Sequence, residues 1–141
     1  MPTVLFCHGA DDRIQAAAAW IATAWAERRP VTVFAPHPAL AERLDRQLWL
    51  YPPTGFVPHC RADSPLAGET PVVITDRLLE RGPAVALLNL SDDTPPGFER
   101  CGELVEIVST DEAVRLAARD RVKHYKALGY AITYQEIARG H

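Results

Sequence analysis

Seven residues near the start of the chain have the spacing of a phosphatase loop. Cys7 and Arg13 are separated by His-Gly-Ala-Asp-Asp, between an expected strand and an expected helix. In a Cys-x5-Arg loop a thiolate attacks phosphorus and the arginine holds the oxygens. Asp11 and Asp12 argue against this chemistry, because carboxylates repel a phosphate dianion and raise the pKa of a nearby thiol. A small phosphatase-like enzyme using Cys7 and Arg13 is therefore the alternative interpretation, and a buried strand cysteine beside a helix cap is the simpler one.

Other motifs of catalysis and ligand binding are missing from the sequence. It contains no Gly-x-x-x-x-Gly-Lys-[Ser/Thr] run, no Gly-x-Gly-x-x-Gly run and no Gly-x-Ser-x-Gly turn. Cys7-His8 and His59-Cys60 could meet as a zinc quartet, but neighbouring side chains of an extended chain point in opposite directions. The sequence therefore predicts no catalytic residue, no metal and no cofactor.

A stripe of positive charge lies on the last expected helix. Its members recur at offsets of four, eight and eleven, which are all near whole helical turns: Arg115, Arg119, Lys123 and Lys126. An adjoining apolar stripe consists of Val114, Ala118, Val122 and Tyr125. A solvated amphipathic helix on a sheet is the ordinary interpretation. The local excess of positive charge on a protein of net charge −3 instead indicates an anionic partner.

Two large apolar side chains flank a proline corner in the middle of the chain. Leu40, Leu44 and Leu48 line one face of a helix that Pro52 and Pro53 must end, so Trp49 falls on its last turn. Phe56 and Val57 follow in a segment that Pro58 marks as a sheet edge or a loop. These residues are either part of the core or an exposed aromatic ridge that anchors a partner.

Short apolar strands alternate with amphipathic helices along the chain. The expected strands are Thr3 to Cys7, Val31 to Ala35, Val72 to Thr75, Ala84 to Leu90 and Leu104 to Val108. The expected helices run from about Arg13 to Arg28, from Pro38 to Trp49, and from a capping box at Ser109 and Glu112 to about Leu128. This order predicts an α/β fold, a single Rossmann-like three-layer domain with a mainly parallel sheet and helices on both faces. Residues 131–141 carry weak signals and are expected to be a flexible tail.

Bulk properties fit one ordinary domain. The chain has 141 residues, 48% hydrophobic and 23% charged, and its sequence pI is about 5.9. The acidic balance argues against a sequence-wide nucleic-acid footprint. No signal peptide and no run of membrane-spanning length is recognisable, and three cysteines without CxxC spacing do not predict a disulfide framework. We therefore expect a cytoplasmic protein.

Two stretches of the sequence also resemble a known family. They are Arg43 to His59, with its Leu48-Trp49, Pro52 and Phe56-Val57-Pro58-His59, and Leu116 to Tyr130. Both are similar to chi subunits of bacterial DNA polymerase III holoenzyme. The resemblance implies a non-catalytic accessory subunit of DNA replication. It would link the clamp loader, through the psi subunit, to the C-terminal tip of single-stranded DNA-binding protein, touching DNA only indirectly.

The resemblance also implies two binding sites. Trp49, Phe56 and Val57 would contact psi. Arg119 and Lys123, with Arg115 beside them, would take the acidic and carboxylate groups of the tip of the single-stranded DNA-binding protein. Val108 and Tyr125 would help line the apolar pocket for the last side chain of that tip. Family members carry an aromatic residue where this chain has Val122, so one wall of the pocket is expected to be thinner.

Overall fold

A single parallel sheet organises the chain. The structure is a computed structural model that describes residues 3–50, 57–77 and 85–137. Seven strands are ordered β3-β4-β2-β5-β6-β1-β7, and each neighbouring pair is parallel. In chain order they are β1 (Thr3–Ala10), β2 (Val31–Phe34), β3 (His59–Arg61), β4 (Val72–Thr75), β5 (Ala86–Asn89), β6 (Glu103–Ser109) and β7 (Ile132–Glu136).

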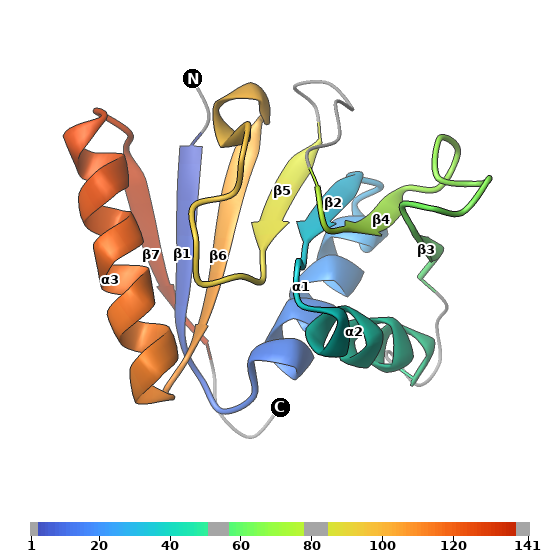
Figure 1. The fold of residues 1–141 in the computed structure, drawn as a ribbon, viewed down its shortest axis with the longest axis horizontal. Coiled ribbons are helices and arrows are strands. Elements are labelled where there is room, and N and C mark those ends of the chain that lie inside the picture. Colours follow the sequence, from blue (N-terminus) through green and yellow to red (C-terminus); the bar gives the residue numbers. More distant parts are fainter. Residues whose placement is uncertain (1–2, 51–56, 78–84, 138–141) are drawn as a thin grey trace.

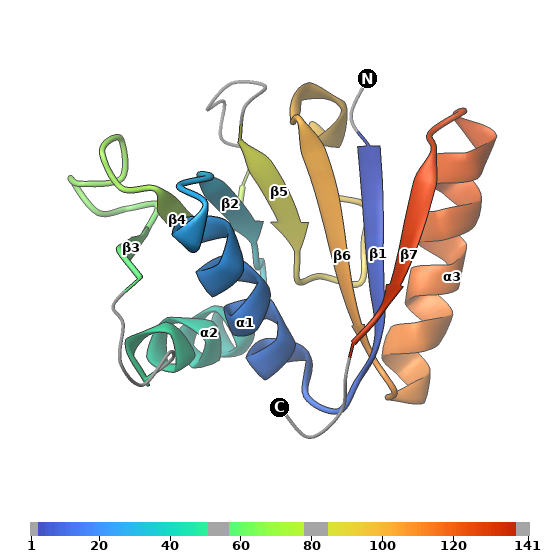
Figure 2. The ribbon, with the colours of Figure 1, turned by 180° about the vertical axis from the view of Figure 1, so that it is seen from behind.

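Helices cover both faces of this sheet. The described residues form α1 (Arg13–Ala26), α2 (Pro38–Leu50), α3 (Glu112–Ala127) and a short 3-10 helix, η1 (Phe98–Arg100). Helices α1 and α2 lie together beneath the half of the sheet that holds β2 and β4, whereas α3 runs beside β7 and β1 (Figures 1 and 2). The predicted three-layer α/β domain with a parallel sheet is therefore confirmed.

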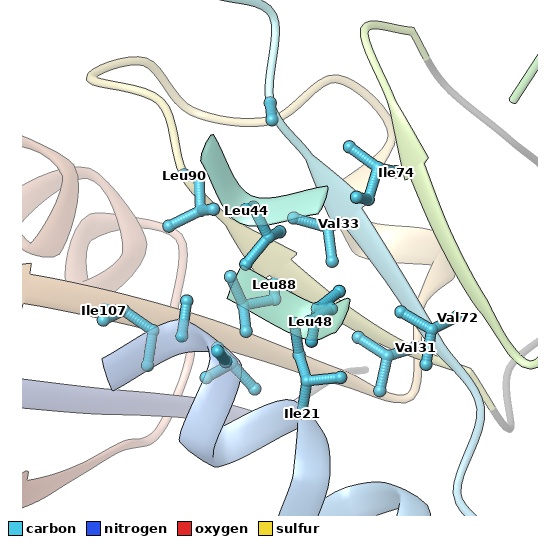
Figure 3. Close-up of a cluster of buried hydrophobic side chains, with 14 of the residues drawn as sticks. Ile21, Val31, Val33, Leu44, Leu48, Val72, Ile74, Leu88, Leu90 and Ile107 are labelled. Atoms are coloured by element: carbon cyan, nitrogen blue, oxygen red, sulfur yellow. The ribbon is translucent and has the colours of Figure 1, made fainter. Parts of the chain in front are cut away.

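The larger core lies between the sheet and the pair α1 and α2. Ile21 of α1 and Leu44 and Leu48 of α2 are completely buried against strand residues (Figure 3). Those strand residues all point to the same face of the sheet: Val31, Val33, Val72, Ile74, Leu88 and Ile107. Because strand side chains alternate, the short apolar runs present a second set of side chains to the opposite face.

That opposite face carries the second core cluster, which holds α3. Val4, Phe34, Leu87 and Leu104 of the strands pack with Phe98 of η1 and Tyr125 of α3. The Phe98 and Tyr125 rings are 5.3 Å apart between centroids. Helix α3 is thus fixed on the sheet by its buried side, which leaves its other side for the surface.

The helix ends follow the sequence signals with one exception. Asp12 caps α1, because its carboxylate accepts from the backbone amides of Ile14 and Gln15. At α3 the expected cap at Ser109 is wrong, since Asp111 accepts from the amide of Val114 at 3.2 Å. Ser109 still belongs to β6, so the strand is longer than expected and the cap moves two residues along.

The end of the chain differs most from expectation. The expected flexible tail is corrected for residues 132–136, which form β7 and pair in parallel with β1 in the register Val4↔Ile132 to His8↔Glu136. Gly129, at φ +90°, turns the chain from α3 into this strand. An edge strand whose side chains are mostly exposed has little apolar alternation, so its pattern is weak.

Candidate functional site

A groove lies between α3 and the β7 edge of the sheet. Its volume is about 620 Å³. Five residues of α3 form one wall, and most of the remaining lining comes from the strands β1, β6 and β7, including Phe6, Val108, Tyr134 and Glu136. Figure 1 shows why these elements meet, because α3 runs the length of β7 and β1 at this end of the sheet. The groove joins segments that are far apart in the sequence.

The α3 wall of the groove is basic. Arg115, Arg119, Lys123 and Lys126 line it, and each is exposed. Among the described residues, none of the observed ion pairs involves any of these four side chains. The positive charge is therefore available to a ligand, on a protein whose net charge is −3. An anionic ligand is the chemical complement of this wall.

The floor of the groove is largely apolar, although Glu136 of β7 also borders it. Val108 is 2% exposed at the end of β6, and Val122 faces the same space from α3. Phe6 of β1 and Tyr134 of β7 are paired across the strands, with ring centroids 5.6 Å apart and ring planes at 62°. A ligand that fits this groove has negative charge along one side and an apolar group to bury.

Tyr125 does not line this groove, which corrects the role that the family resemblance implied for it. Successive helical residues advance by 100°, so Tyr125 lies about 60° beyond Val122, on the side away from Lys123. The side chain is completely buried in the second core cluster, and its hydroxyl donates to Glu106 Oε2 at 2.6 Å. Val108, Arg115, Arg119 and Lys123 are the predicted residues that the fold does bring together.

Glu106 is the centre of a buried polar network that sequence reasoning missed. Its side chain is 0% exposed and accepts from Arg121 Nε and Nη2 at 3.0 Å each, from Asn89 Nδ2 at 3.1 Å and from Tyr125. Arg121 also donates to the carbonyl of Asp92 at 3.0 Å. Every polar atom named here has a partner, which is the condition for a stable buried charge.

The network shifts the pKa values of two of its members, Tyr125 and Arg121. Burial, then the charge of Glu106 and the hydrogen bond to it, raise the pKa of the Tyr125 hydroxyl far above its ordinary range. Burial alone would lower the pKa of Arg121, but the adjacent Glu106 carboxylate outweighs burial and the pKa of Arg121 is raised. Arg121 therefore stays charged beneath α3 and is no part of the basic wall.

Comparison with known proteins identifies the family. The family "DNA polymerase III chi subunit, HolC" matches residues 1–133. The chain belongs to the DNA polymerase III chi subunit family. It is 27% identical over 127 residues to DNA polymerase III subunit chi of Pseudomonas aeruginosa, covering 90% of this chain and 88% of that one. It is 26% identical over 119 residues to subunit chi of Haemophilus influenzae, covering 82% and 81%. As a chi-family chain it is an accessory subunit of the polymerase, not a catalytic one.

The chi-family assignment agrees with the positions of Cys7 and Arg13. Cys7 is buried in the larger core, and burial, with a smaller effect of the Glu103 charge, raises the pKa of its thiol to about 11. Arg13 donates to the carbonyls of Ile107 at 2.7 Å and Ser91 at 2.9 Å, and its guanidinium lies 3.7 Å from Asp92. A thiol that stays protonated and an arginine held by the fold do not form a phosphatase loop.

The two Cys-His pairs of this chi-family chain cannot share an ion. Cys7-His8 lies on β1 and His59-Cys60 on β3, and four strands separate β1 from β3 in the sheet. At about 4.8 Å per strand the two pairs are more than about 20 Å apart.

None of the described helices has the length and hydropathy that a membrane span requires.

Of the residues expected to contact psi, Trp49 is exposed and Val57 is buried. Trp49 is 63% exposed on the last turn of α2, and its ring meets His59 edge-on at 5.1 Å. Val57 is 1% exposed and belongs to the larger core, so its inclusion in a surface ridge is wrong. Phe56 and the proline corner lie outside the described residues.

Proposed function

We propose that this chi-family chain bridges two partners, the psi subunit of the clamp-loader complex and the C-terminal tip of single-stranded DNA-binding protein. The groove supports the second contact, because it combines a basic wall free of intramolecular ion pairs among the described residues with an apolar floor. A peptide with several carboxylates and a terminal apolar side chain complements both features. The chain would act in the cytoplasm and approach DNA only through its partners.

The exposed Trp49 supports the contact with psi. An aromatic ring that is 63% exposed but held edge-on by His59 is a preorganised anchor for a partner with its own apolar surface. Phe56 follows Trp49 in the same region of the sequence and is proposed as a second anchor.

The observation that carries the bridging function is the separation of the two surfaces. Trp49 contacts His59 of β3, and β3 is one edge strand of the sheet. The groove lies at β7, which is the other edge strand. Two partners bound at opposite edges of a seven-stranded sheet do not exclude one another, so one chain can hold both.

Titration calorimetry with matched variants tests the groove. The ligand is a peptide of the last nine residues of the single-stranded DNA-binding protein, for which micromolar affinity is expected. Arg119→Ala should weaken binding about 10- to 150-fold, because it removes charge-assisted hydrogen bonds worth about 1.5–3 kcal/mol. Arg61→Ala, an exposed arginine on β3, is the matched control and should change nothing. Equal affinity for Arg119→Ala and wild type would place the tip elsewhere.

The bridge itself is tested with both partners present. Trp49→Ala should weaken capture of psi while binding of the peptide persists, and Arg119→Ala should do the reverse. Wild type should hold psi and the single-stranded DNA-binding protein together in a ternary complex on size exclusion. Competition between the two partners for wild type would refute separate surfaces.

A further inference from the structure

Two side chains of β7 face the groove although they lie past the matched part of the family. The family match ends at residue 133, and Tyr134 and Glu136 follow it. The register Phe6↔Tyr134 and His8↔Glu136 places both on the face of the sheet that α3 covers. The strand β7 therefore adds two side chains to the groove that the family match does not cover.

Tyr134 is held firmly but is not covered. Its ring packs edge-on against Phe6 at 5.6 Å, and the two residues are direct neighbours across the β1 and β7 ladder. Lys126 Nζ lies 5.8 Å from the centroid of the Tyr134 ring, so a cation–π contact joins the C-terminal end of α3 to β7. The side chain is still 51% exposed. Strand pairing and ring packing thus fix the orientation of the Tyr134 ring, while about half of the side chain remains accessible to a ligand.

The aromatic surface of the groove comes from the strands alone. Along α3, the apolar residue that faces the groove is Val122, which is small and half-buried. Opposite it stand the paired rings of Phe6 and Tyr134. An apolar ligand group that enters between the helix and β7 therefore meets valine on one side and tyrosine on the other, and most of the contact area must come from the tyrosine.

We propose that Tyr134 is the wall that receives the terminal apolar side chain of an acidic peptide bound in this groove, and so determines specificity for that side chain. This rests on the groove being the peptide site proposed above. Phe6 is a positioning residue, because it sets the orientation of the Tyr134 ring. Arg119 and Lys123 bind the carboxylates of the peptide, while Tyr134 selects the residue at its end.

A double-mutant cycle between protein and peptide tests the inference. The probes are the nine-residue C-terminal peptide of the single-stranded DNA-binding protein and the same peptide ending in alanine. Tyr134→Ala should weaken binding of the natural peptide about 5- to 20-fold, and should weaken binding of the alanine-ended peptide less than about 2-fold. Tyr134→Phe keeps the ring and should bind like wild type. Gln135→Ala, on the same strand but the opposite face, controls for damage to β7.

Each outcome of the cycle has a defined meaning. Equal losses for the two peptides in Tyr134→Ala, no loss for either, or a loss in Tyr134→Phe as large as in Tyr134→Ala would overturn the inference. If wild type binds and Arg119→Ala does not, while the cycle shows no coupling, the groove is the peptide site and only the role of Tyr134 is wrong. If wild type binds neither peptide, both proposals fall. Thermal unfolding of Tyr134→Ala, which should match wild type, verifies that the half-exposed ring is not needed for folding.

Discussion

Removing one partner of the buried pair Glu106 and Arg121 should destabilise the fold far more than removing one partner of a shorter, more exposed ion pair whose glutamate also lies on β6. Arg121 meets Glu106 at 3.0 Å with side chains 4% and 0% exposed. Arg29 meets Glu103 at 2.6 Å with side chains 42% and 25% exposed. Distance alone would rank the Glu103 pair first. Burial reverses the ranking by expected energetic cost. Water screens the Arg29–Glu103 pair, whereas no water can replace a lost partner of the buried Arg121–Glu106 pair.

Glu106→Gln and Glu103→Gln therefore form a matched comparison on β6. Glu106→Gln leaves the Arg121 guanidinium buried without its counter-charge, which costs about 3–5 kcal/mol. Glu103→Gln removes a partly solvated pair and should cost less than about 1 kcal/mol. The free energy of unfolding of a small domain is about 5–15 kcal/mol in total, so Glu106→Gln should be strongly destabilised.

Urea unfolding followed by circular dichroism measures the difference. With a denaturant slope of about 2 kcal/mol per molar, Glu106→Gln should lower the midpoint by about 2 M, and Glu103→Gln by less than about 0.5 M. The pair Glu106→Gln and Arg121→Met should also be non-additive by more than about 1 kcal/mol. Equal midpoints for the two glutamine variants, or additive effects in the cycle, would refute the reasoning.

Three further predictions concern stability. Leu48 is 0% exposed, so Leu48→Ala should lower the free energy of unfolding by about 2–5 kcal/mol. Trp49 is 63% exposed, so Trp49→Ala should lower it by less than about 1.5 kcal/mol. Thermal melts measure both, and similar losses would place Trp49 in the core. Gly129→Ala should cost about 1 kcal/mol in urea unfolding through its φ of +90° alone, since an added Cβ meets nothing within 4 Å; an unchanged midpoint would contradict this. The pKa of Cys7 is raised from 9.0 to about 11, so the unfolded thiol loses its proton first as pH rises, and about 2–3 kcal/mol of stability should disappear between pH 9 and 11. Cys7→Ala should make that alkaline decline less steep, while the part due to Cys101, whose pKa burial also raises to about 11, should remain. A pH profile unchanged by Cys7→Ala would show that the Cys7 thiol is accessible.

The sequence predicted the fold because its buried strands leave a clear pattern. Runs such as Val31 to Ala35 and Val72 to Thr75 are apolar on both faces, which is typical of strands covered on both sides by helices. The strand β7 left no such pattern, since four of its five residues are exposed and its only described neighbour is β1. An edge strand is specified by its partner, not by its own periodicity.

The sequence also predicted the basic wall, but of Val108 and Tyr125, the two residues expected to help line the apolar pocket beside it, only Val108 lines the groove. The four basic residues of α3 share one face by helical spacing alone, so no tertiary knowledge was needed to group them. The family resemblance assigned Tyr125 and Val57 to binding surfaces, yet both are buried. Whether an aromatic or aliphatic side chain faces a partner or the core depends on elements distant in sequence, which a local pattern does not contain.

Helix α3 shows how the fold divides positive charge between two functions. Arg119 and Arg121 are two residues apart, which is about 200° around the helix, so one faces the groove and the other faces the sheet. Glu106 and the Asp92 carbonyl accept hydrogen bonds from Arg121. Asn89 and the Tyr125 hydroxyl donate to Glu106 and complete the network beneath α3. This side fixes the rotation and height of the helix over β6. The outer side then presents Arg119 and Lys123 at a set position relative to Val108 and Tyr134, which lie on strands. A groove built from a helix and a sheet edge keeps its shape only if the helix cannot roll. Loss of the Glu106 network should therefore weaken peptide binding indirectly, even in the fraction of molecules that stays folded.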